Sequence, residues 1–239
     1  MNIARRIIVA LDFDNVDDAE AIVDRLGDTG QSYKVGLELL TVAGPTLATR
    51  LVGEGKDVFL DLKLFEIPTS VAGAVRAAGR LGATMVTVHA MGGSKIMEAA
   101  VRAAADFPQL HVIALTVVTS LTDTDLAAIG LSATIEEQVT RLTRLAQRAG
   151  CHGVVASPQD AALLRAELGP DMLIVTPGVT LQAEWNPPTE HARPAHPAAA
   201  IRAGATHIVI GRSLTRAPDP AAVLAHLEDE LGSCQRPTT

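Results

Sequence analysis

The stretch DVFLDLKL, residues 57–64, has the alternation of a β-strand, with three charged residues on a face that is normally apolar when buried. Successive side chains of a strand point to opposite faces. The aliphatic side chains therefore share one face: Val58, Leu60, Leu62 and Leu64. Asp61 and Lys63 share the other face, near the end of the strand. We interpret the aliphatic face as packed against helices and the charged pair as projecting into the mouth of a β-barrel.

Two other short apolar runs place charged side chains at equivalent points. In RIIVALD, residues 6–12, the alternation ends in Asp12, and in SYKVGL, residues 32–37, Lys34 lies opposite its apolar neighbours. Charges that enter one barrel mouth from neighbouring strands converge, and burying them unpaired would cost several kcal/mol each. A structural ion-pair network is one interpretation. We favour an active site, because catalytic groups of barrels gather at strand ends.

The rest of the chain alternates short apolar runs with longer amphipathic stretches rich in Ala and Leu, as in a parallel sheet with crossover helices. We expect strands over 6–12, 32–36, 57–63, 84–89, 111–117, 153–156, 172–176 and 207–210. We expect helices over 17–26, 39–53, 69–81, 94–105, 135–149, 160–168, 197–203 and 220–230. This pattern predicts an α/β fold, a single-domain (βα)8 TIM barrel over 1–231, with a flexible C-terminal tail over 232–239. An open doubly wound sheet is the alternative, although no G-x-G-x-x-G follows the first strand.

The composition excludes several classes of partner. The chain has 20 Lys and Arg against 27 Asp and Glu, a formal charge of −7, and only 3% aromatic residues. It therefore offers neither the basic surface nor the stacking side chains that nucleic acids require. The first apolar run is interrupted by Asp12, too early for a signal sequence or a membrane span. Cys151 and Cys234 stand far apart and lack metal-ligand spacing, so we expect no disulfide framework and a reducing, cytoplasmic location.

A further signal lies in GATHIVIGRSLT, residues 204–215, where an expected strand ends at Gly211 and Arg212. In barrels, the loops after strands seven and eight commonly hold a phosphate. Gly211 permits close approach of the backbone, and the Arg212 guanidinium offers a fork of donors to a phosphate dianion. Together with the turn at 176–178, this segment predicts a phosphorylated substrate.

These segments together resemble the orotidine 5′-monophosphate decarboxylase family over nearly the whole chain. The matching fragments follow one another in the family's order: ALD at 10–12, YKVG at 33–36, DLKLFEIP at 61–68, VTVHAMGG at 86–93, LTVVTSL at 115–121, VTPGV at 175–179 and IVIGRSLTRAPDP at 208–220. Each fragment is weak alone, whereas the ordered set is specific. The resemblance implies a homodimeric (βα)8 barrel that converts orotidylate to uridylate and carbon dioxide without a metal or an organic cofactor.

The resemblance implies a role for each charged group at the barrel mouth. Lys63 would protonate the C6 carbanion as carbon dioxide leaves, and Asp61 would lie beside the substrate carboxylate. Lys34 would hold the charged array and the ribose, and Asp12 would bind a ribose hydroxyl. Glu66 would complete the array by reaching the site of the neighbouring subunit. Lysines flanked by carboxylates favour the charged form, which suits a proton donor.

Four further positions correspond to family residues that contact substrate. Ser70, like Glu66, matches a position that reaches the partner subunit's site. Thr119 matches the hydroxyl residue that reads the pyrimidine edge, and Gly211 and Arg212 match the residues that grip the phosphate.

The motif around Glu66 departs from the family's usual Asp-x-Lys-x-x-Asp-Ile-Pro-Asn-Thr. Glu66, Thr69 and Ser70 stand in the places of the last Asp, the Asn and the Thr. Glutamate keeps the charge but adds a methylene, and a displacement of about 1 Å can cost about a hundredfold in rate.

The expected phosphate loop departs as well. Family members of this length often carry Arg after the Pro-Gly-Ile turn and a Gln further along. Here Pro177 opens the turn, Thr180 stands in the place of the Arg and His191 in that of the Gln, with Gln182 as the alternative to His191. We expect these four residues to bind substrate, and the loop 177–193 to close over the phosphate and exclude water.

Two other functions remain open from the residues. A metal-dependent aldolase or decarboxylase of the same barrel superfamily, acting on a sugar phosphate, would use Glu66 and Glu38 as metal-holding carboxylates. A non-catalytic nucleotide-binding or structural dimer would have lost its chemistry through the substitutions, although such a decayed site would be expected to have lost its lysines first.

Overall fold

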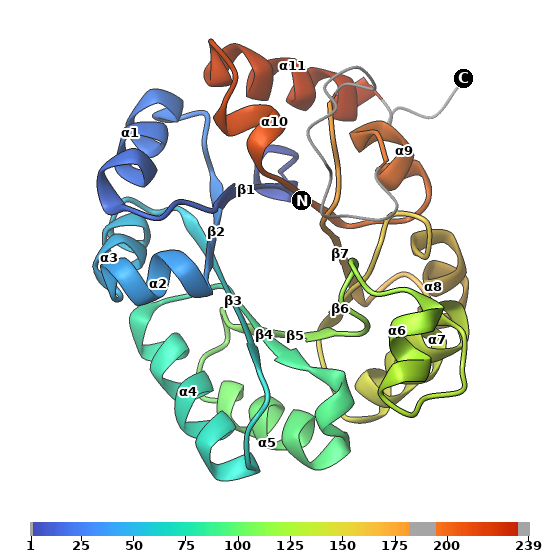
Figure 1. Ribbon diagram of the computed structural model, residues 1–239. Helices are drawn as coiled ribbons and strands as arrows, with labels where there is room; N and C mark the ends of the chain where they lie inside the picture. The colour runs from blue at the N-terminus through green and yellow to red at the C-terminus, as the bar shows by residue number, and fades with distance from the viewer. Residues whose placement is uncertain (1, 182–194, 234–239) are drawn as a thin grey trace.

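Eight parallel strands close into a barrel in a computed structural model that describes residues 2–181 and 195–233 (Figure 1). The strands follow one another around the barrel in chain order, and β8 pairs with β1. Their bounds are β1 Ile7–Leu11, β2 Ser32–Gly36, β3 Asp57–Leu64, β4 Met85–His89, β5 His111–Leu115, β6 Gly153–Val155, β7 Leu173–Thr176 and β8 His207–Ile210. The closed barrel confirms the predicted fold class and excludes the open sheet.

Helices surround the barrel on its outside (Figure 1). Their bounds are α1 Val16–Leu26, α2 Leu37–Ala43, α3 Thr46–Gly53, α4 Pro68–Leu81, α5 Ser94–Ala104, α6 Asp123–Ala128, α7 Ile135–Arg148, α8 Ala161–Leu168, α9 Pro197–Arg202, α10 Arg212–Thr215 and α11 Pro220–Ser233. Short 3-10 helices occupy Ala4–Arg6 and Ala90–Gly92. Across residues 2–181 and 195–233, none of the helices combines the length and apolarity needed to cross a membrane.

The alternation of side chains divides the core into two layers. Between the strands and the helices lies the larger cluster, which contains Val58 and Leu60 of β3 and, at its edge, Leu62 and Leu64. The barrel interior holds a smaller, separate cluster: Ile8, Ala10, Phe59, Met85, Ile113, Leu115, Val155, Val175 and Val209. Phe59 precedes Asp61 on the inward face, so the orientation predicted for residues 57–64 is correct.

The expected helix over 39–53 is wrong as a single element. Helix α2 ends at Ala43 and α3 begins at Thr46. Gly44 has a φ of 60°, in the left-handed region that favours glycine, and Pro45 cannot donate a backbone hydrogen bond to continue the first helix. The apolar periodicity of the sequence continues across this break, because both helices bury apolar residues on the same side.

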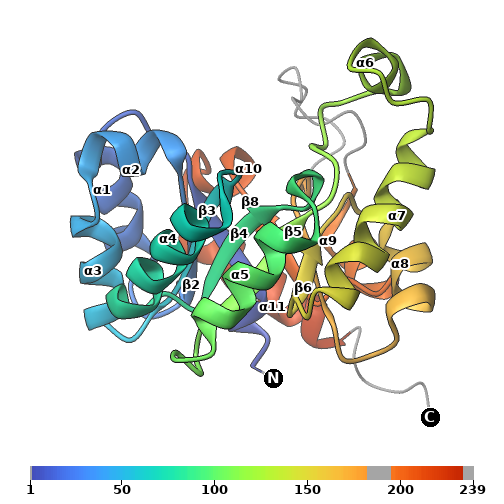
Figure 2. The same ribbon diagram turned by 90° about the horizontal axis from the view of Figure 1, so that it is seen from below.

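Two short helices were not expected. Helix α6 lies in the connection between β5 and α7, and Figure 2 shows it standing above the barrel on the side away from the N-terminus. Thr122 and Asp125 form a capping box at its start, a signature that is present in the sequence. Helix α10 begins directly after β8, at Arg212. At the end of the described chain, α11 includes Gly232 and Ser233, and the rest of the expected tail lies outside the described residues.

A buried histidine lies at the amino-terminal end of the barrel. His207, the first residue of β8, is 4% exposed, and its Nδ1 is 3.0 Å from the hydroxyl oxygen of Thr206. Burial, with smaller contributions from the positive charge of Arg6 and from His111, lowers the pKa of His207 from 6.5 to about 4. His207 is therefore neutral in the folded protein at neutral pH.

We expect this histidine to make the fold sensitive to acid. Between pH 6.5 and about 4 the unfolded chain binds a proton at this position that the folded chain excludes. The free energy of unfolding should therefore fall by up to about 3 kcal/mol as the pH is lowered through this window. Urea titrations at several pH values give the slope of the free energy of unfolding against pH, and this slope should be smaller in His207→Gln than in the native protein. The exposed His226→Gln should keep the native slope, and an unchanged slope in His207→Gln would contradict the assignment.

Candidate active site at the carboxyl end of the barrel

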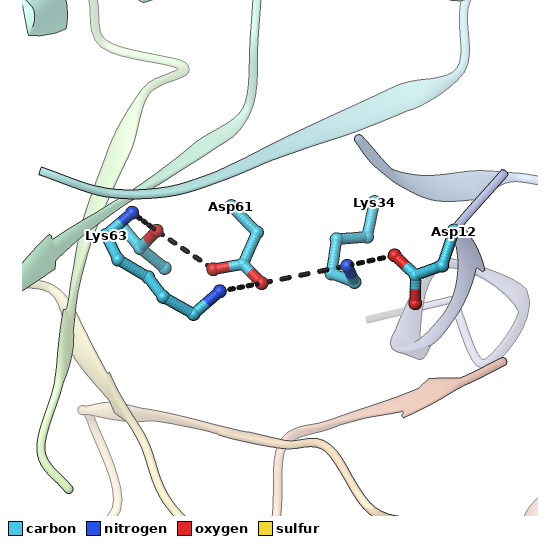
Figure 3. A network of polar contacts seen from close by, with 5 residues as sticks. Asp12, Lys34, Asp61 and Lys63 are labelled. Atoms are coloured by element: carbon cyan, nitrogen blue, oxygen red, sulfur yellow. Dashed lines mark hydrogen bonds and ion pairs between the residues drawn. The ribbon is translucent and has the colours of Figure 1, made fainter. Parts of the chain in front are cut away.

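Four charged side chains of alternating sign form a row at the carboxyl end of strands β1 to β3 (Figure 3). Lys34 Nζ lies 2.7 Å from Asp12 Oδ1 and 3.7 Å from Asp61 Oδ2. Lys63 Nζ lies 2.8 Å from the same Asp61 Oδ2. The structure thus brings together the four charges that the sequence placed at the barrel mouth, in the order Asp12, Lys34, Asp61, Lys63.

The parallel register of the strands sets this order. Ala10 pairs with Lys34 across β1 and β2, and Gly36 pairs with Asp61 across β2 and β3. A Cβ added to Gly36 would lie 3.3 Å from Lys34 Nζ and 3.5 Å from Asp12 Oδ1. Glycine at this position therefore leaves the space that the Lys34–Asp12 ion pair occupies. This role of Gly36 could not be predicted from the sequence, because it depends on Lys34 and Asp12 lying beside it in the folded barrel.

The centre of the row is more enclosed than its ends. The side chains of Lys34 and Asp61 are 11% and 14% exposed, whereas those of Lys63 and Asp12 are 36% and 55% exposed. Charges withdrawn from water interact more strongly, so the inner pair fixes the arrangement and the outer groups stay accessible to a ligand. Lys63 presents its ammonium group at the edge of an ordered set of charges.

The backbone of Lys63 is unusual. Its φ of 49° makes it the one non-glycine residue with positive φ in the described part of the chain. The ladder between β3 and β4 shifts register between Leu60 and Leu64, so a bulge carries this residue. A conformation of this kind costs roughly 1–3 kcal/mol and persists where the surroundings hold it, often at functional sites. Thr87 of β4 stabilises this conformation, since the Lys63 N–H donates to Thr87 Oγ1 at 2.8 Å.

His89, the last residue of β4, borders the lysine. Its Nδ1 accepts the Met91 N–H at 3.3 Å, and its ring lies 5.7 Å from that of Phe65. Burial, and secondly the charge of Lys63, lower the pKa of His89. The imidazole is therefore neutral at neutral pH, and it adds no positive charge beside Lys63.

The other expected site residues follow the carboxyl ends of β3, β5 and β8, in connections and in the first turns of helices. Glu66 and Ser70 are exposed, at the end of β3 and in the first turn of α4, and Glu66 Oε1 accepts the Ile67 N–H at 2.5 Å. Thr119 is half-buried in the turn after β5. Gly211 and Arg212 follow β8, and both are half-buried.

The expected phosphate loop is described only at its ends. Pro177 follows β7, and the Thr180 N–H donates to the carbonyl oxygen of Ala195 at 3.0 Å. Gln182 and His191 lie outside the described residues, as does most of the loop between them.

The site offers no grouped metal ligands among residues 2–181 and 195–233. In these ranges no three His, Cys, Asp or Glu side chains are gathered so that they could hold a metal ion. Both carboxylates of the row, Asp12 and Asp61, are engaged by lysine. The described part of this site is thus a set of ammonium and carboxylate groups paired with one another.

Fold and site together define a (βα)8-barrel enzyme with a preorganised Lys–Asp row at its carboxyl end. The match to known proteins is specific. The chain belongs to the orotidine 5′-phosphate decarboxylase / HUMPS family, whose model matches residues 5–227.

Individual relatives resemble the chain over nearly its full length. A protein of Nitrosomonas europaea named orotidine 5′-phosphate decarboxylase is 48% identical over 228 residues, which are 95% of this chain and 97% of that protein. One of the same name from Chromohalobacter salexigens is 48% identical over 94% of this chain and 95% of its own length. The crystal structure of orotidine 5′-phosphate decarboxylase from Lactobacillus acidophilus superposes with a TM-score of 0.84 at 35% identity, covering 95% of this chain and 99% of that one.

Proposed function

We propose that this chain is a carboxy-lyase that converts orotidine 5′-phosphate to uridine 5′-phosphate and carbon dioxide in pyrimidine nucleotide synthesis, with Lys63 as the proton donor. The observation that carries the proposal is the row of alternating charges, in which Lys63 Nζ is held 2.8 Å from Asp61 Oδ2. Family membership and relatives of the same name at 48% identity support the reaction. Cys151 is a buried free thiol, which suits the reducing cytoplasm that we propose as the location.

The proposed chemistry needs only a proton and a positive charge at the reacting carbon. The C6–carboxylate bond breaks, carbon dioxide leaves, and the electron pair of that bond remains on C6. The Lys63 ammonium stabilises this developing charge and then gives it a proton, which forms the C6–H bond. The neutral amine regains a proton from solvent, to which the side chain is 36% exposed. The proposal includes neither a metal nor an organic cofactor.

Binding at a distance from C6 would hold the substrate in place. We assign the ribose to Asp12 and Lys34, and the pyrimidine edge to Thr119. Binding energy from parts of a substrate that do not react can be used to hold the reacting centre in its productive geometry. A pyrimidine nucleotide presents its phosphate, ribose and base at separate points, which suits contacts spread around one barrel mouth.

The phosphate would be bound after β7 and β8, where β8 lies beside β1 and thus next to the Asp12 end of the row. We assign it to Gly211 and Arg212, with Pro177 and Thr180 at the start of the loop that follows β7. Gln182 and His191 are also assigned to the phosphate, from the sequence alone. The guanidinium of Arg212 matches a phosphate dianion in charge and in geometry.

We further propose that the enzyme is a homodimer in which Glu66 and Ser70 of each subunit reach the other subunit's site. Support comes from the residues beside Glu66, since Phe65 and Ile67 are 62% and 61% exposed. Large apolar side chains exposed to this degree on both sides of a charged residue are typical of an interface rather than of a free surface.

Mixed dimers test whether Glu66 acts across the interface. Lys63→Ala and Glu66→Ala are each expected to be inactive as homodimers. After subunit exchange in a 1:1 mixture, half of the dimers are mixed, and each mixed dimer holds one site with native Lys63 and native Glu66. Activity should therefore return to about a quarter of the native value for a two-fold symmetric dimer. If Glu66 served its own subunit, the mixture would stay inactive.

The function itself is tested by adding orotidine 5′-phosphate to the purified protein with and without EDTA. The expected result is loss of orotate absorbance with release of carbon dioxide, unchanged by EDTA. Loss of turnover with EDTA would instead favour the metal-dependent sugar-phosphate enzyme. Tight binding of uridine 5′-phosphate without turnover would favour the non-catalytic dimer.

A further inference from the structure

We propose that Thr87 is a positioning residue, whose hydroxyl group sets the placement of both Lys63 and Asp61. This inference rests on the proposed function, because it concerns how the row of charges is held for that reaction. Thr87 is an uncharged residue of β4, the strand beside β3.

The hydroxyl group of Thr87 joins Asp61 and Lys63 through two different hydrogen bonds. Its oxygen accepts the backbone N–H of Lys63 at 2.8 Å, and its own proton is donated to Asp61 Oδ1 at 3.0 Å. The other oxygen of the same carboxylate, Oδ2, receives Lys63 Nζ at 2.8 Å. Thr87 therefore fixes the backbone of the lysine and the orientation of the carboxylate that holds its ammonium group. The side chain is fully buried.

The bulge in β3 explains why a side chain, and not the backbone of β4, binds the Lys63 N–H. Leu60 pairs with Val86 and Leu64 with Val88, so Thr87 alone faces the three residues between them. At this point the regular ladder is interrupted, and the Lys63 N–H is directed to the Thr87 side chain rather than to a β4 carbonyl. Threonine is stiff at χ1 because it is β-branched, so the hydroxyl stays in one place. Asp61, Lys63 and Thr87 form a closed ring of hydrogen bonds.

Loss of the Thr87 hydroxyl should lower the catalytic rate and not the affinity for the substrate. Thr87 would act on the substrate only through Asp61 and Lys63, so its hydroxyl contributes to the geometry in which the proton is delivered. Displacement of a catalytic group by about 1 Å can lower a rate by about a hundredfold. Loss of a hydroxyl that contacts no substrate should leave substrate binding nearly unchanged.

The test compares Thr87→Val, which keeps the shape and removes the hydroxyl, with Thr87→Ser, which keeps the hydroxyl and removes a methyl group. We expect Thr87→Val to lower kcat by about 30- to 100-fold with KM changed less than about threefold. Thr87→Ser should restore kcat to within about fivefold of the native value, short of full recovery because serine is not held at χ1. Thr84→Val is the matched control, since its hydroxyl also bonds to β3, to the Val58 carbonyl at 3.2 Å, but far from the row.

Thermal unfolding and uridine 5′-phosphate binding identify variants that have lost their fold, and Thr87→Ala replaces Thr87→Val if the latter does not fold. A native kcat in Thr87→Val would overturn the inference. Equal losses in the Val and Ser variants would also overturn it, because shape and not the hydroxyl would then matter. A rise in KM that accounts for the whole loss would place Thr87 in binding and overturn the positioning role. Inactivity of the native enzyme in the same assay would instead refute the proposed function on which this role depends.

Discussion

Replacement of Lys63 by alanine is expected to lower kcat for orotidine 5′-phosphate by at least about 10⁴-fold, because one change removes both the proton donor and the charge that stabilises the carbanion. The neighbouring lysine cannot take over the role. Lys34 Nζ is engaged by Asp12 at 2.7 Å and its side chain is only 11% exposed. The measurement is the loss of orotate absorbance under saturating substrate, with carbon dioxide release as the second signal.

A second variant separates the loss of the proton donor from the loss of the charge, and a third serves as the control. Lys63→Arg keeps a positive charge but offers a guanidinium that does not release its proton at neutral pH, so it should recover little of the lost rate. Lys56→Ala is the matched control, because Lys56 lies before the start of β3, where its Nζ donates to the Gly27 carbonyl at 2.8 Å. Native activity in Lys63→Ala would remove the lysine from the mechanism, and recovery in Lys63→Arg would reduce its role to that of a charge.

The location of the charged row was predictable from the sequence, because alternation along a strand fixes which side chains share a face. Asp61 and Lys63 stand two residues apart on β3, and both point into the barrel mouth. The convergence of Asp12 and Lys34 on them follows from the rule that parallel strands end at the same edge of a barrel. These arguments need only local periodicity and the direction of the strands, which the sequence contains.

The features that tune the site depend on contacts between strands, which local patterns do not reveal. The positive φ of Lys63 and the register shift beside it break the period of two on which the strand prediction relied. The space left by Gly36 matters only because Lys34 and Asp12 lie across it. The division of residues 39–53 into two helices was signalled by Gly44 and Pro45, but the shared apolar face of the two helices masked that signal. Strand pairing and register are thus the information that local sequence patterns do not contain.

Asp61→Asn is expected to separate kcat from KM. Asparagine keeps the shape of the side chain but removes the charge that Lys63 and Lys34 share, at 2.8 Å and 3.7 Å from Asp61 Oδ2. Without this carboxylate the Lys63 ammonium loses the partner that aims it, and the two lysines repel each other. We expect kcat to fall by about 10²- to 10³-fold, in line with the loss of a charged group that orients a general acid.

KM should stay level or decrease in the same variant, because the proposed complex places the substrate carboxylate beside Asp61. Two like charges about 4 Å apart repel by about 4 kcal/mol at an effective dielectric constant near 20, and this repulsion disappears as neutral carbon dioxide leaves. A group that repels the bound substrate more than the transition state raises kcat without improving binding. Removal of its charge should therefore lower kcat without raising KM. The control is Asp57→Asn, at the other end of β3, where the carboxylate pairs with Arg5 at 2.6 Å and no effect on either constant is expected. A large rise in KM with native kcat would show that Asp61 binds the substrate, and would refute the repulsion between the two carboxylates.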